Sequence, residues 1–137
     1  AFKGAFQSAQ ATEEKLLIIK ALGNAGLVEF VPLLEPIIKD RSAKPEVRAK
    51  AIYSLRRVNP MAKHLVHSIC GPIILTPEAP LEVRIAALLI TVHSHPESGV
   101  FTMIAQQLAR DPSVQFTNFA YTTLKAIAQS ELPCNRN

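Results

Sequence analysis

The sequence predicts an all-α fold, an α-solenoid of antiparallel helix pairs, and three observations support it. Prolines and glycines divide the 137 residues into segments of helix length. No alternating apolar pattern indicates a strand, because the apolar run at 73–75 is too short to form one. Three segments, at 45–49, 80–85 and 112–116, also open with similar residues. We therefore expect seven helices in antiparallel pairs with a right-handed superhelical progression.

These breaks set the bounds of the expected helices, which follow a flexible lead-in at residues 1–11. They cover residues 12–22, 28–39, 45–58, 60–69, 80–93, 97–110 and 112–129. Thr12 suits the N-cap of the first helix. Gly23 or Asn24 is expected to end that helix in the left-handed conformation, and Gly26 completes a glycine-rich corner before the second helix.

Prolines shape the next three helices. Pro32 is tolerable only in the first turn of the second helix, and Pro36 is expected to kink that helix. Pro45 suits the first position of the third helix. The fourth helix is amphipathic and is expected to end at residues 70–72, Cys-Gly-Pro. The fifth is apolar on nearly every side, so neighbouring helices must cover most of it.

The similar openings indicate a repeat. Val47 and Val83 lie 36 positions apart, and Val83 and Val114 lie 31 apart. A helix-pair repeat of that length is typical of solenoids, in which each pair buries its apolar face against its neighbours. The chain holds about three and a half such pairs and no polar capping repeat. We expect an isolated chain to self-associate through its terminal faces, with these candidates: Leu16, Ile18, Ile19, Phe116, Phe119 and Ile127.

Composition and motifs exclude several classes of function. The net charge of +4 is too small to indicate a nucleic-acid-binding protein, and no aromatic residues alternate with the basic ones. The sequence has no glycine-rich phosphate loop, nucleophile elbow or positioned acid–base pair, so we expect a non-enzymatic protein with no catalytic residue and no cofactor. No apolar run is long enough to span a bilayer. Because the chain begins at Ala1 without Met, we take it for a piece of a longer precursor.

Two groups of residues are candidates for binding. His64, His67 and Cys70 share one side of a predicted helix, but a structural zinc site wants four ligands, so a solvated histidine face is the preferred interpretation. A second group forms the densest positive patch. It is either a solvated helix face or a contact surface for acidic protein or anionic phospholipid. Its members are Arg48, Lys50, Arg56, Arg57 and Lys63.

The corner at 21–26 and the ordered helix openings at 46–51, 80–87 and 111–115 resemble the helical domain of the large lipid transfer proteins. This family includes vitellogenin and lipovitellin, apolipoprotein B, apolipophorin and the microsomal triglyceride transfer protein, and the resemblance extends from about Thr12 to Cys134. It implies a two-layered superhelix that braces the β-sheets of a lipid cavity in a secreted, extracellular lipid transport or storage protein. Within the family, vitellogenin is the interpretation that we favour.

The resemblance also implies partners. These are lipid and the β-sheet domains of the same precursor, and by analogy Cys134 forms a short-range disulfide with a cysteine beyond the chain. Cys70 is then a buried free thiol. The alternatives are a cytosolic HEAT-like protein-interaction scaffold and a peripheral membrane-binding module that uses the basic third helix.

Overall fold

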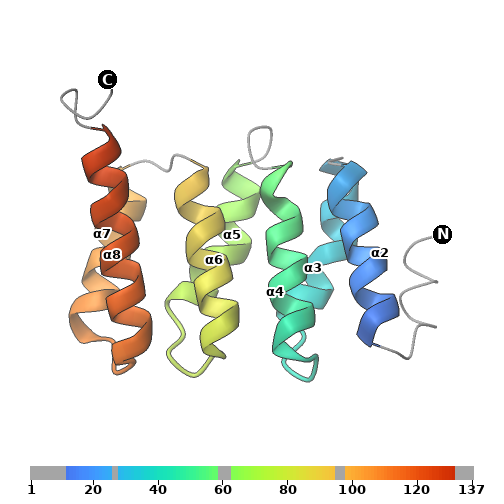
Figure 1. Cartoon of the computed structure of the whole chain (residues 1–137), viewed down its shortest axis with the longest axis horizontal. Coiled ribbons are helices and arrows are strands. Elements are labelled where there is room, and N and C mark those ends of the chain that lie inside the picture. Colours follow the sequence, from blue (N-terminus) through green and yellow to red (C-terminus); the bar gives the residue numbers. More distant parts are fainter. Residues whose placement is uncertain (1–11, 26–27, 59–62, 95–97, 132–137) are drawn as a thin grey trace.

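The computed structural model describes residues 12–25, 28–58, 63–94 and 98–131, and within them it contains seven α-helices, two short 3₁₀ helices and no strand (Figure 1). In chain order these are α2 (Thr12–Ala25), η1 (Val28–Phe30), α3 (Val31–Lys39), α4 (Pro45–Tyr53), η2 (Ser54–Arg56), α5 (Lys63–Ile74), α6 (Leu81–His93), α7 (Ser98–Arg110) and α8 (Val114–Glu131). The predicted lead-in at 1–11, Gly26 and Cys134 lie outside the described residues.

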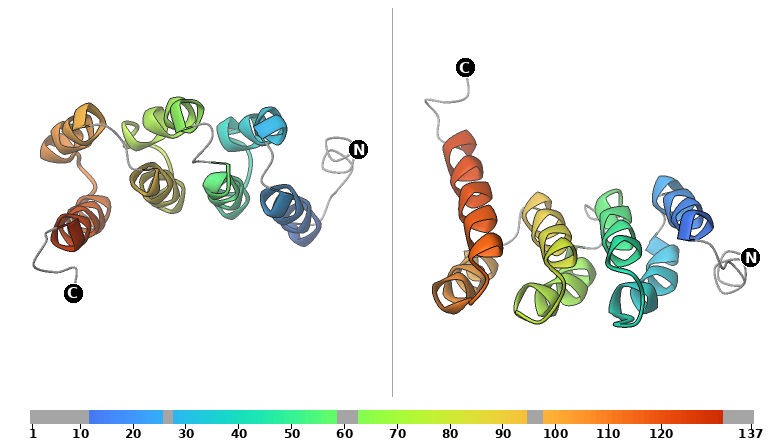
Figure 2. Two further views of the ribbon diagram at one scale, coloured as in Figure 1. Left: turned by 90° about the horizontal axis from the view of Figure 1, so that it is seen from above. Right: turned by 60° about the horizontal axis from the view of Figure 1, so that its bottom comes forward.

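The helices form two layers. Seen from above, α2, α4, α6 and α8 stand in one row and α3, α5 and α7 in the other, and consecutive helices run in opposite directions (Figure 2). Neighbours within the first row pack on each other, as α2 does on α4, α4 on α6 and α6 on α8. The predicted fold class, an all-α superhelix of antiparallel pairs in two layers, is confirmed.

The core is aliphatic, and α6 lies at its centre. It packs against α4, α5 and α8, so helices cover it on most sides, as its sequence predicts. Its side chains Ala86 and Leu88 are fully buried, together with Ile52 and Leu55 from α4 and η2. Burying one such large aliphatic side chain contributes about 1.5–3 kcal/mol, so the array is held chiefly by contacts between adjacent helices.

The first helix does not end where the sequence predicts. α2 continues through Gly23 and Asn24 to Ala25, and Gly23 does not adopt the left-handed conformation. The glycine serves a close approach instead: a Cβ added to Gly23 would lie 2.9 Å from Cβ of Ser54. Because α2 crosses η2 at this point, the missing side chain lets the two backbones come together.

Other boundaries also differ from the prediction: the second helix begins as η1 before α3, and the last runs over 114–131 in place of 112–129. The third helix changes to 3₁₀ geometry at Ser54, whose hydroxyl donates to the carbonyls of Lys50 and Ile19. This hydroxyl competes with the helical backbone and ties η2 to α2.

α5 does not end at Cys70-Gly71-Pro72 but includes Pro72 and continues to Ile74. α3 likewise contains Pro36 as a continuous helix. In both helices two buried isoleucines follow the proline directly, at 37–38 and 73–74. Burial of these side chains offsets the hydrogen bond that each proline removes.

Candidate functional site

Two arginines tie the layers together in the same way. Arg48 of α4 donates from Nε to the Ile38 carbonyl at 2.9 Å, and Arg84 of α6 donates from Nη2 to the Ile74 carbonyl at 2.6 Å. Each carbonyl lies ten residues before its arginine, near the end of the preceding helix, where backbone oxygens lack helical partners. In the α3–α4 and α5–α6 pairs, a buried cation therefore caps the first helix from the second.

Arg84 also joins two pairs. It forms a bidentate ion pair with Asp111, with Nη1 3.1 Å from Oδ1, and the side chains are 1% and 0% exposed. Gln107 Nε2 and the Ser113 backbone N–H also donate to the Asp111 carboxylate, each at 2.9 Å. The guanidinium lies 3.8 Å from the centre of the Phe116 ring. One charge thus holds α5, α6, α7 and α8 at a single point.

These contacts change the acidity of Asp111. The hydrogen bond from Arg84 is the main cause, and those from Gln107 and Ser113 add to it, so the pKa of this carboxyl is held well below its usual range although burial opposes the shift. Asp111 is therefore ionised at every physiological pH.

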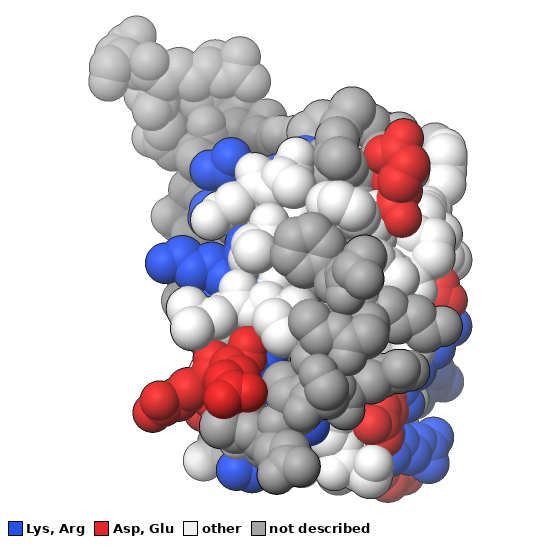
Figure 3. Space-filling view, turned by 90° about the vertical axis from the view of Figure 1, so that its right-hand side faces the viewer, with Lys and Arg blue, Asp and Glu red and all other residues white. Residues whose placement is uncertain are grey.

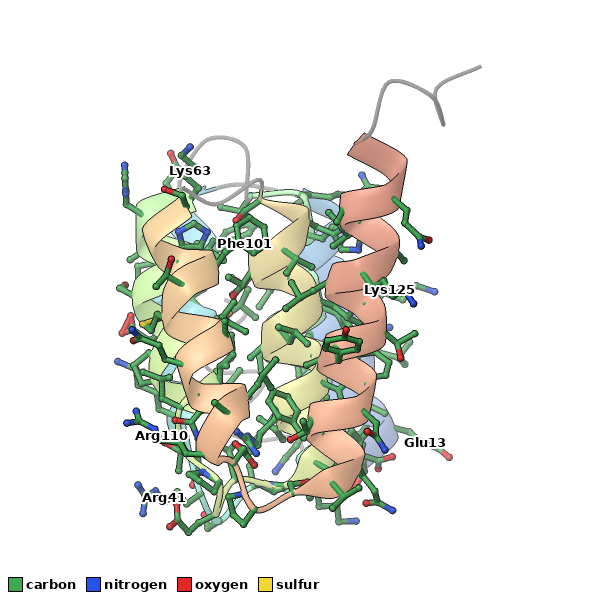
Figure 4. The ribbon with its side chains drawn as sticks, turned by 90° about the vertical axis from the view of Figure 1, so that its left-hand side faces the viewer. Glu13, Arg41, Lys63, Phe101, Arg110 and Lys125 are labelled. Atoms are coloured by element: carbon green, nitrogen blue, oxygen red, sulfur yellow. The ribbon has the colours of Figure 1, made fainter. Side chains whose placement is uncertain are left out.

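Arg48 does not belong to an exposed patch, contrary to the sequence prediction. It is only 6% exposed, and burial is the main cause that lowers its pKa. Lys63 also stands apart, because it begins α5 in the other layer (Figure 4). The other three predicted cations lie together with one that the sequence analysis missed, Lys20 of α2.

These four cations surround a hollow of about 320 Å³ where α2 meets α4 and η2. We call it the basic hollow; its lining residues are Lys20, Gly23, Asn24, Lys50, Tyr53, Ser54, Arg56 and Arg57. In Figure 3, which faces the α2 end of the molecule, lysine and arginine atoms gather along the upper part of one edge and acidic atoms lie below them. Lys20 could have been found from sequence, because it precedes Asn24 by one helical turn at the predicted corner.

The three metal-ligand candidates do not converge. His64 is exposed, His67 contacts the Ser94 hydroxyl, and Cys70 is a fully buried free thiol. Burial raises the pKa of Cys70 to about 12, so it stays protonated and packs as a small apolar residue, as expected. No cluster of three His, Cys, Asp or Glu residues suited to a metal ion occurs among the described residues.

The predicted terminal faces are partly wrong. Ile19 and Phe116 are fully buried, and the remaining four candidates, Leu16, Ile18, Phe119 and Ile127, are half-buried against the core. The large apolar side chains most exposed at the two ends are instead Leu17 on α2 and Val114 and Tyr121 on α8. The turn of each terminal helix explains the difference, because residues next to each other in sequence face about 100° apart.

Comparison with known proteins settles the family. The family described as the vitellogenin TPR domain matches residues 1–125. The chain belongs to the vitellogenin TPR-domain family. Vitellogenin-6 of Caenorhabditis elegans is 32% identical over 131 residues, which is 96% of this chain and 8% of that protein. The vitellogenin of Ichthyomyzon unicuspis is 30% identical over 128 residues, 88% of this chain and 7% of that protein.

The fold agrees with the family. A solved structure described as lipid–protein interactions in lipovitellin superposes with a TM-score of 0.86 at 26% identity, over 93% of this chain and 14% of that chain. This vitellogenin-family chain therefore spans only a small fraction of the length of its relatives. The resemblance to the large lipid transfer proteins is confirmed. None of the described helices is long and apolar enough to cross a membrane.

Proposed function

We propose that this chain is a non-enzymatic structural segment of an extracellular lipid transport and storage protein of the vitellogenin type, in which its two-layered array braces the domains that hold lipid. The supporting observation is the superposition on lipovitellin over 93% of the chain, together with its membership of the vitellogenin TPR-domain family. The cytosolic HEAT-like scaffold is not favoured, because the relatives over nearly the whole chain are vitellogenins.

To brace other domains, the helices of the array must keep fixed positions relative to one another. The Arg84–Asp111 pair supplies this at the α6–α8 contact, since it ties four helices through one buried group. Both terminal nitrogens of Arg84 are hydrogen-bonded, whereas its Nε has no hydrogen-bond partner among the described residues. The bonds that are made fix the relative position of the elements that carry them. The partners in this proposal are the β-sheet domains of the same precursor and the lipid that the full-length protein carries. The proposal includes no cofactor.

The test is made on the full-length protein that carries this chain, secreted from cells and purified. We expect phospholipid and neutral lipid to co-purify with it, as measured by lipid mass spectrometry. We also expect Arg84→Met to reduce the lipid bound per molecule, while the exposed control Lys125→Gln leaves it unchanged. A secreted protein free of lipid would contradict the function, and equal lipid in both variants would contradict the bracing role.

An isolated chain should also self-associate, since solenoid pairs share their apolar faces with neighbours. The exposed Leu17, Val114 and Tyr121 are the residues expected at the contact. Sedimentation at tens of micromolar should show dimers or larger species for the parent and weaker association for Val114→Glu with Tyr121→Glu. A parent that stays monomeric would show that these end faces do not associate.

A further inference from the structure

The basic hollow carries charge that the described part of the chain does not neutralise. Within that part, the ion pairs are Lys39 with Glu35 and Arg84 with Asp111. No carboxylate from these residues therefore pairs with Lys20, Lys50, Arg56 or Arg57, all of which are exposed. Tyr53 lies at the rim, where burial is the main cause that raises its pKa and the negative charge of Glu82 of α6 adds to the shift.

Capping of helix ends accounts for only part of this charge. α2 and α4 both end at the hollow, and Arg57 donates to the Asn24 carbonyl near the end of α2 at 3.3 Å. Each helix C-terminus carries the equivalent of about half a negative charge. Two ends offset about one of the four positive charges, so about three remain without an ion-pair partner among the described residues.

The shape of the hollow suits a small anion. Lys20 stands on the α2 wall, and Lys50 and Arg56 stand on the α4 and η2 wall. Gly23 has no side chain to fill the space between the walls, and the Ser54 hydroxyl is directed to the Ile19 and Lys50 carbonyls. The cations thus converge from two helices on an open space of about 320 Å³.

We propose that the basic hollow binds a phosphate group. Arginine presents a planar set of donors that matches phosphate oxygens, and lysine adds a mobile point charge. The hollow holds both types, and its one aromatic side chain, Tyr53, offers no series of rings for stacking nucleic-acid bases. The site goes beyond the bracing role, because packing between layers needs no open, charged surface. The phosphate can come from the head group of an anionic phospholipid or from a soluble phosphate compound.

The experiment uses the full-length protein and two double variants that each remove two charges. Lys20→Gln with Lys50→Gln changes both walls of the hollow, and glutamine keeps the helix propensity of lysine. Arg41→Gln with Lys125→Gln is the matched control, since both side chains are exposed and neither lines the hollow (Figure 4). One arm measures binding to supported phosphatidylcholine bilayers with and without phosphatidic acid, and the other measures binding of labelled inorganic phosphate by equilibrium dialysis.

We expect the hollow variant to bind phosphatidic acid bilayers about 25-fold more weakly, from about fivefold for each of the two basic side chains at an anionic surface. The control should keep the parent affinity, and inorganic phosphate should compete with the bilayer. If only the dialysis arm distinguishes the two variants, the site stands and its ligand is a soluble phosphate. If the hollow variant and the control behave alike in both arms, the proposal is overturned, because binding then depends on net charge alone.

Discussion

The pairs α3–α4 and α5–α6 each carry an arginine at the equivalent position, but the two arginines make different sets of contacts. In each pair the arginine caps the preceding helix ten residues back, through Arg48 to Ile38 and Arg84 to Ile74. Arg84 then continues to Asp111 of the next pair, whereas Arg48 has no carboxylate within ion-pair distance among the described residues. These two pairs thus share the same hydrogen bond between their helices, and at Arg84 the arginine also bonds the next pair through Asp111.

The contact on the other side of α4 differs again. α2 meets η2 through Gly23 and Ser54, with a neutral hydroxyl bonded to the Ile19 carbonyl. One end of the array is therefore joined by close backbone approach and the other by a buried ion pair. The comparison indicates that a solenoid can join successive pairs by unrelated chemistry as long as each contact removes the same apolar faces from water.

The largest expected effect comes from Arg84→Met, which keeps the apolar stem and removes the charge. It should lower the free energy of unfolding by about 3–5 kcal/mol, because Asp111 is left as a buried charge without its cation. Urea denaturation followed by circular dichroism measures this. Adding Asp111→Asn to the same chain should recover part of the loss. A loss below about 1 kcal/mol would mean that the pair behaves as a surface salt bridge.

Arg48→Met should cost less, about 1.5–3 kcal/mol, because it removes one charge-assisted hydrogen bond and leaves no buried carboxylate behind. The same denaturation experiment gives the comparison directly. If Arg48→Met lowers the free energy of unfolding as much as Arg84→Met does, then the hydrogen bond from each arginine to the preceding helix accounts for the loss in both variants. The ion pair with Asp111 would then add nothing measurable.

Gly23→Ala should cost about 1–2 kcal/mol although alanine favours helices, since the new Cβ would lie 2.9 Å from Cβ of Ser54. The matched control is Gly99→Ala in α7, where a Cβ meets nothing within 4 Å. This control should leave thermal stability unchanged or raise it. Equal melting temperatures for the two variants would show that α2 and η2 do not depend on close approach.

The smallest effect is a dependence on pH. The pKa of Asp111 is lowered in the folded protein, so the stability that it contributes is complete above the unfolded pKa of about 3.9 and is lost as pH falls toward the folded value. Asp111→Asn should therefore flatten the fall in stability below about pH 4. Asp40→Asn is the comparison: the exposed Asp40 carboxylate accepts hydrogen bonds from the Ser42 hydroxyl and backbone N–H, which lower its pKa, and its removal should flatten the fall less than Asp111→Asn because Asp40 forms no buried ion pair among the described residues. If stability falls as steeply below about pH 4 in Asp111→Asn as in the parent, the Arg84–Asp111 pair does not cause the loss of stability in acid.

Much of the architecture followed from sequence. Prolines, glycines and the repeated openings located all seven helices, because helix boundaries depend on local backbone restrictions that single residues impose. The same repeat contained a signal that was overlooked: Pro36 and Pro72 each precede two isoleucines and stand 12 residues before Arg48 and Arg84. That spacing indicates that the two arginines occupy equivalent positions in the repeat, and the structure shows that both bond the ends of the preceding helices.

The sequence by itself determined the helices, their pairing and the aliphatic core, since periodicity and breakers act over a few residues. Only the tertiary structure decided which charges are buried and which are exposed. Arg48 and Lys50 are two positions apart on one helix, yet one lies under α3 and the other opens on the basic hollow. Asp111 becomes the partner of Arg84 across 27 residues because the α7–α8 pair stacks on α6. Such contacts depend on how pairs stack, and no local pattern specifies that.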